Sequence, residues 1–105
     1  MNDPVFVEAA RAFAQRILTH GGADDAARLR YAWRTALSRS ASESETAILS
    51  RTLSAQLATY AADKPAAALV KVGDLAKPPG LDDSQLAAWT AVANVLLNLN
   101  ETISD

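Results

Sequence analysis

A stretch of mostly apolar residues runs from Gln85 to Leu99, with the sequence QLAAWTAVANVLLNL. Its apolar side chains fall on every side of a helical wheel, so a helix formed here needs contacts all round. Such a helix is only about 22 Å long. It is too short for a membrane span and is interrupted by Thr90, Asn94 and Asn98. The pattern predicts that residues 83–99 form the central helix of a small helical domain.

Two earlier segments repeat apolar residues at steps of three and four, which is typical of amphipathic helices. The first begins at Asp3-Pro4, a capping side chain followed by proline, and ends at His20-Gly21-Gly22, where glycine suits a C-cap. The second begins at Asp24-Asp25, whose carboxylates suit the positive end of a helix dipole. The predicted stripes are Phe6, Ala9, Ala10, Phe13 and Ile17, opposite Glu8, Arg11, Gln15 and Thr19, and then Leu29, Ala32, Trp33, Ala36 and Leu37.

The start of a third helix is marked by Ser42-Glu43-Ser44-Glu45, which has the form of a capping box. We expect this helix to run to about Ala62. Its predicted core stripe is Leu49, Leu53, Leu57 and Tyr60.

The segment that follows the third helix contains most of the prolines of the chain. Pro65 opens a short predicted helix over 66–72, and the run DLAKPPG over 74–80 is a loop, because adjacent prolines prevent a helix. Asp82 and Gln85 form a variant capping box that starts the last helix, with Leu81 as a hydrophobic staple.

Together these segments predict an all-α fold, a compact bundle of four main helices plus one short helix around an apolar C-terminal helix. The abundance of alanine, the best helix former, agrees with this class. At 105 residues the chain is long enough for one domain with its own core, so we expect residues 1–105 to form a single helical domain.

Composition and charge exclude several kinds of chemistry. The chain has no cysteine, which excludes disulfides, thiolate metal sites and cysteine nucleophiles. Its formal charge of −2 argues against strongly electrostatic binding to nucleic acid or anionic membranes. The first residues, MNDPVFVEAARAF, have neither a basic region nor a continuous apolar run, so we expect no signal peptide in this chain.

The search for catalytic and metal-binding residues finds no constellation that predicts an enzyme. His20 is the only histidine, which excludes a two-histidine metal site, and we interpret it as a surface or capping residue. Asp24-Asp25 and Asp82-Asp83 stand at predicted helix starts, where aspartate is expected for capping. The prediction is therefore a non-enzyme with no cofactor, no metal site and no catalytic residue.

Four arginines of the second predicted helix form the basic cluster of the chain: Arg28, Arg30, Arg34 and Arg39. Arg30 and Arg34 are four residues apart on one edge, where like charges repel slightly, so an acidic partner is expected for them. The face is either solvated, with intramolecular ion pairs, or a ligand or partner surface.

Two tryptophans and one asparagine within the predicted helices each allow two interpretations. Trp33 and Trp89 fit the stripes and are predicted to lie in the core rather than to form a ligand platform. Asn94, within the apolar helix, either makes a buried polar contact that sets the helix register or occupies an edge.

Two segments together resemble a known bacterial family. Arg30 to Glu45, RYAWRTALSRSASESE, is similar to a pattern of arginine, aromatic, alanine-leucine, arginine, proline-serine and glutamate near the end of its proteins. Leu86 to Ile103, LAAWTAVANVLLNLNETI, resembles its closing run, AWT.VA..LLNL.E, although Ala41 replaces a usual proline and Asn100 a usual aspartate. The family is the planctomycete-type surface domain of unknown function, often found in exported proteins that also carry a cytochrome c-like domain.

The resemblance covers essentially the whole chain, which corresponds to the C-terminal part of the family's much longer proteins. It implies an extracytoplasmic parent protein, in the periplasm or at the cell surface, with an all-helical end domain. It supplies no catalytic residue, and this chain carries no haem motif.

Three functional hypotheses follow. The first is a structural or protein-interaction module that contacts the rest of the parent polypeptide, another protein or a second copy of itself as a homo-dimer. The second is a module that binds an anionic ligand or glycan through the arginine face. The third is an accessory part of an enzyme whose active site lies outside this chain.

Overall fold

The computed structural model describes residues 4–62 and 82–104, which form four α-helices and, within these two ranges, no strand. The helices are α1 (Pro4–His20), α2 (Asp25–Leu37), α3 (Glu43–Ala62) and α5 (Asp83–Ser104). The all-helical prediction is confirmed. The predicted start at Asp3, the short helix over 66–72 and the staple at Leu81 lie outside the described residues.

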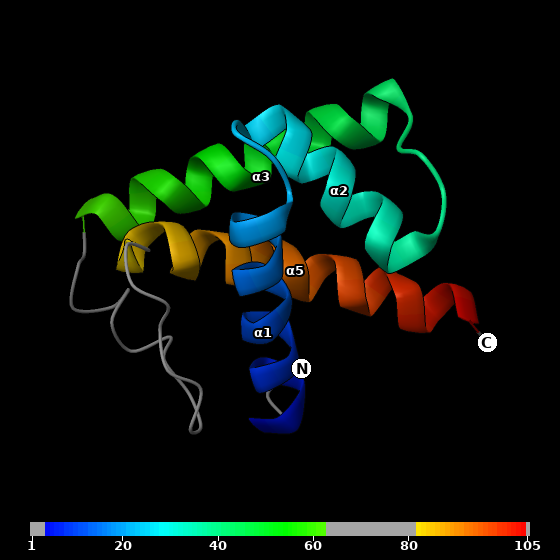
Figure 1. Cartoon of the computed structure of the whole chain (residues 1–105), viewed down its shortest axis with the longest axis horizontal. Coiled ribbons are helices and arrows are strands. Elements are labelled where there is room, and N and C mark those ends of the chain that lie inside the picture. The colour runs from blue at the N-terminus through cyan, green and yellow to red at the C-terminus, as the bar shows by residue number, and fades with distance from the viewer. Residues whose placement is uncertain (1–3, 63–81, 105) are drawn as a thin grey trace.

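The helix α5 contacts each of the other three helices. In Figure 1, α3 runs alongside α5, whereas α1 crosses α5 steeply and α2 packs on the same side of α5 as α3. The radius of gyration is 13.0 Å, which is the size expected for a compact folded chain of about 100 residues.

The predicted N-terminal boundaries of three helices are confirmed by side-chain caps. Asp24 accepts a hydrogen bond from the backbone N–H of Ala27 at 2.8 Å, and Asp82 accepts one from Gln85 at 3.2 Å. In the capping box of α3, the Ser42 N–H donates to Glu45 Oε1 at 2.9 Å and the Glu45 N–H donates to Ser42 Oγ at 3.2 Å. These bonds satisfy N–H groups that a helix leaves unpaired in its first turn.

The core lies where the other three helices pack against α5. Trp89, Val92 and Leu96 are completely buried, and Trp33 of α2 is 3% exposed, so the prediction that both tryptophans are core residues is confirmed. The Ser84 hydroxyl of α5 also donates to the carbonyl oxygen of Tyr60 near the end of α3, at 3.1 Å. The core includes Ala10, Phe13, Ala14, Ile17, Leu18, Leu29, Ala32, Trp33, Ala36, Leu49, Leu53, Leu86, Ala88, Trp89, Val92, Ala93 and Leu96.

The stripe predicted for the first helix is wrong at two positions. Arg11, predicted to face solvent, is buried, whereas Ala9, predicted to face the core, is exposed. The reason is that α1 contacts both α2 and α5, so the covered arc is wide and is rotated toward Ala14 and Leu18. On a helical wheel Arg11 falls within that arc and Ala9 falls just outside it.

The second helix is shorter than the arginine face predicted for it. It ends at Leu37 because Ser38 adopts the left-handed conformation, with φ 58°, and its N–H donates to the carbonyl oxygen of Arg34. Arg39 therefore does not extend the face of α2. It belongs to the connection between α2 and α3.

Candidate functional site

The four arginines predicted to share one face fall into two groups in the structure. Two of them have acidic partners, and two have none among the described residues. Arg28 donates to Asp25 within α2 at 3.3 Å, and Arg39 forms an ion pair with Glu45. Arg30 and Arg34 are exposed, and no described residue forms an ion pair with either of them. The acidic partner expected for Arg30 and Arg34 is therefore not found in residues 4–62 or 82–104.

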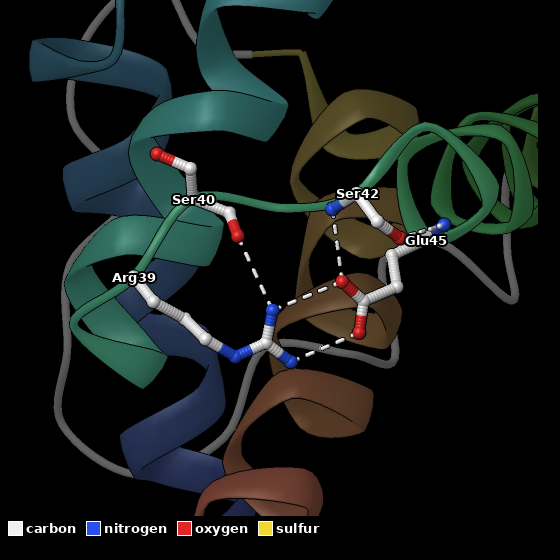
Figure 2. A network of polar contacts seen from close by, with 4 residues as sticks. All are labelled: Arg39, Ser40, Ser42 and Glu45. Atoms are coloured by element: carbon white, nitrogen blue, oxygen red, sulfur yellow. Dashed lines mark hydrogen bonds and ion pairs between the residues drawn. The ribbon is translucent and has the colours of Figure 1, made fainter.

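Arg39 forms hydrogen bonds across the connection between α2 and α3, as Figure 2 shows. Its Nη1 and Nη2 donate to the two carboxylate oxygens of Glu45, each at 2.9 Å, and Nη1 also donates to the Ser40 carbonyl oxygen at 3.2 Å. The guanidinium carbon lies 4.9 Å from the ring centroid of Trp33, within cation–π range. A paired guanidinium thus joins the core of α2 to the first turn of α3.

The charges of the Arg39–Glu45 ion pair stabilise each other. The hydrogen bonds from Arg39, followed by the backbone bond from Ser42, lower the pKa of Glu45 from its ordinary 4.5 to about 2. The hydrogen bond to Glu45 in turn raises the pKa of Arg39. The Glu45 carboxylate is therefore ionised throughout the neutral range, and its oxygens already accept hydrogen bonds from Arg39 and Ser42.

A surface hollow of about 470 Å³ lies beside the Arg39–Glu45 ion pair, between α2 and the start of α3. Arg30 and Arg34, neither of which forms an ion pair with a described residue, both line this cavity. The complete lining is Ala26, Arg30, Tyr31, Arg34, Thr35, Ser40, Ala41 and Thr46.

The hollow also contains residues to which the sequence pattern assigned no binding role. Tyr31 and Thr35 are four apart and directly follow Arg30 and Arg34, so a helical wheel of α2 would have placed them at the same edge. Ala41 and Thr46 come from beyond the end of α2. Their presence at the hollow depends on the turn at Ser38 and carries no sequence signal.

The other candidate residues have structural explanations in the structure. His20 is exposed at the end of α1, in agreement with its interpretation as a surface residue. Asp24 and Asp82 use their carboxylates as helix caps, as predicted. Across the described ranges, no group of three or more histidine, aspartate or glutamate side chains is arranged to hold a metal ion.

Asn94 is half-buried on α5. Its Oδ1 atom is buried and accepts no hydrogen bond from the described residues. The buried polar contact that would set the helix register is therefore not found at this oxygen within the described residues.

The chain was compared with known proteins. No family profile, no curated protein and no solved structure matches it. None of the helices in the described ranges has the length and apolar character needed to cross a membrane.

Proposed function

We propose that this chain is a protein-interaction module that binds an acidic partner at the hollow lined by Arg30 and Arg34. The observation that carries this proposal is that two exposed arginines, one helical turn apart, share a cavity and have no ion pair with a described residue. Two like charges at this spacing repel each other weakly, and a bound anion relieves that repulsion.

The framework around the hollow is suited to a preformed binding surface. Arg39 and Glu45 hold the connection between α2 and α3 with two hydrogen bonds, and the half-buried Tyr31 packs against the core. A site that is rigid before binding loses less conformational entropy when the partner arrives.

The nature of the partner and its location rest on the resemblance described above. The partner is the remainder of a larger exported bacterial polypeptide or another extracytoplasmic protein, and the module has a structural role at the C-terminal end of its parent. Nucleic acid is a poor candidate because the formal charge of the chain is −2.

A second candidate function is the binding of an acidic or sulfated glycan at the same hollow. It is favoured by the ring of Tyr31 and the hydroxyl-bearing residues Thr35, Ser40 and Thr46, which lie beside the arginines. Glycan binding is expected to be sensitive to salt and to be lost in an Arg30→Ala/Arg34→Ala double variant.

Site-specific photo-cross-linking in cells that make the full natural protein tests the interaction function. A photoreactive residue at Thr35, in the hollow, should capture a protein partner, whereas the same residue at the exposed Ser54 of α3 should not. The cross-link should disappear in an Arg30→Glu/Arg34→Glu variant.

A charge-matched control separates a local effect from a change in net charge. The exposed Arg16 and Arg51 lie on α1 and α3, and the Arg16→Glu/Arg51→Glu variant changes the net charge by the same amount. Equal cross-linking from Thr35 and Ser54, or equal loss in both double variants, would show that the hollow is not the interaction site.

A further inference from the structure

We infer that the ligand of the hollow is a short acidic peptide segment, in which a carboxylate binds between Arg30 and Arg34 and a neighbouring aliphatic side chain enters the hollow. This inference rests on the proposed interaction function and specifies the chemistry that the site recognises.

Two acidic side chains close in sequence to the lining residues of the hollow already have partners. Glu45 accepts two hydrogen bonds from Arg39 and one from the Ser42 N–H, and Asp25 is paired with Arg28. Neither carboxylate is left to neutralise the pair formed by Arg30 and Arg34. A planar carboxylate is a good ligand for that pair because guanidinium groups donate two parallel hydrogen bonds to it.

The walls of the hollow contribute apolar surface beside that charge. Ala26 and Ala41 contribute methyl groups, and Tyr31 contributes part of a half-buried side chain that packs on the core. A bare inorganic anion leaves this surface exposed to water, whereas an aliphatic side chain next to the carboxylate covers it. The lining thus favours a ligand that is both acidic and apolar.

The size of the hollow agrees with a small segment of chain. Its volume of about 470 Å³ falls in the range of ligand sites, roughly 300–1,000 Å³. The hydroxyl-bearing Thr35 of α2 and Thr46 of α3 both line the hollow and provide hydrogen-bonding groups for the backbone of a bound peptide.

The test is a titration of the isotope-labelled 105-residue chain with three capped peptides, followed by NMR chemical shifts. The first peptide, Ac-GLEELG-NH2, carries both the carboxylates and the aliphatic side chains. The second, Ac-GLQQLG-NH2, lacks the charge, and the third, Ac-GSEESG-NH2, lacks the aliphatic side chains. A size-defined heparin oligosaccharide and inorganic phosphate serve as the competing anions.

The expected result is saturable binding of Ac-GLEELG-NH2, with the largest shifts at Tyr31, Thr35 and Thr46. Each of the other two peptides should bind at least about tenfold more weakly. The Arg30→Gln/Arg34→Gln variant should lose the binding, whereas the exposed pair Arg16→Gln/Arg51→Gln should keep it.

Four outcomes would overturn the inference. Equal affinity for Ac-GLEELG-NH2 and Ac-GSEESG-NH2 would show that the hollow selects charge alone, and tighter saturable binding of the heparin oligosaccharide would assign it to a glycan. If no peptide binds while the Thr35 cross-link to a protein persists, the ligand chemistry inferred here is wrong and the interaction function stands. If no peptide binds and the Thr35 cross-link to a protein is also absent, the interaction function is wrong as well.

Discussion

Arg39 is the residue whose role depends most clearly on its immediate surroundings. The sequence pattern assigned it to the arginine face of the second helix, but it lies two residues after the end of α2. Its guanidinium lies against Trp33 and is paired with Glu45. Glu45 has two tasks, because the carboxylate that completes the capping box also accepts the ion pair. A single carboxylate thus stabilises both the start of α3 and the connection that precedes it.

The lowered pKa of Glu45 predicts a specific acid dependence of stability. Because the folded-state pKa is about 2 and the ordinary value is 4.5, the ionised carboxylate stabilises the fold fully above about pH 4.5. This contribution is lost as the pH falls through 2. Chemical denaturation at several pH values should show that the wild type loses more free energy of unfolding between pH 4.5 and 2 than Glu45→Gln does.

The control for the acid dependence is Glu43→Gln, in the same helical turn. It keeps the pair between Glu45 and Arg39, so it should follow the wild-type slope in this range. Parallel curves for the wild type and Glu45→Gln would contradict the assignment.

At the scale of elements, helix ends are set by local bonds and helix faces by their neighbours. The caps at Asp24, Ser42 and Asp82 each involve residues three apart in sequence, so these starts were predictable from the sequence alone. The buried face of α1 was predicted less well, because contacts with two other helices determine which arc is covered. Arg11 and Ala9 exchanged their expected environments for this reason.

The capping box of α3 predicts the effect of removing one hydroxyl. Ser42→Ala removes the acceptor of the Glu45 N–H bond, and we expect a loss of about 1 kcal/mol in the free energy of unfolding. Ser44→Ala is the matched control, because Ser44 is exposed within the helix and caps nothing. A loss of similar size in both variants, measured by thermal or urea unfolding, would argue against the cap.

For the molecule as a whole, stability depends on the contacts that α5 makes with α1, α2 and α3. Trp89, Val92 and Leu96 have no exposed surface, whereas Val95 and Leu99 are 41% and 38% exposed. The described part of α5 therefore has a buried side toward the other helices and a narrower side that reaches solvent. Exposed apolar residues in such small number are common on monomeric proteins.

Trp89 is the central residue of these contacts. Trp89→Ala should lower the free energy of unfolding by about 3–5 kcal/mol, because it removes a large aromatic side chain that is completely buried and leaves a cavity. Val95→Ala, one of the exposed positions, should cost less than about 1 kcal/mol. A Trp89→Ala cost below that limit in urea unfolding would show that the core is not centred here.

The association state follows from the same distribution of buried surface. We expect the 105-residue chain to sediment as a monomer at micromolar concentrations and to unfold cooperatively. The reason is that contacts within one chain already remove Trp89, Val92 and Leu96 from solvent. A concentration-dependent dimer would contradict this expectation. If Leu99→Ser then restored the monomer, the exposed side of α5 would be the interface.

Much of the candidate site was visible in the sequence, but its division into parts was not. The sequence contains the cluster of four arginines, and the i, i+4 spacing indicates that Arg30 and Arg34 share an edge. Arg28 pairs locally with Asp25, three residues earlier in α2. The pairing of Arg39 with Glu45, and the hollow beside Arg30 and Arg34, depend on the course of the connection after Ser38. A left-handed serine has no strong sequence signal, since glycine or asparagine is more usual there.

By itself, the sequence determined the helical class, three of the helix starts and the burial of both tryptophans, because these follow from spacing and bonds within one or two turns. Only the tertiary structure decided which arc of α1 is buried, where Arg39 finds its partner and which residues surround the hollow. These features require contacts between segments, and such contacts are set by how the helices pack rather than by the local pattern of any one of them.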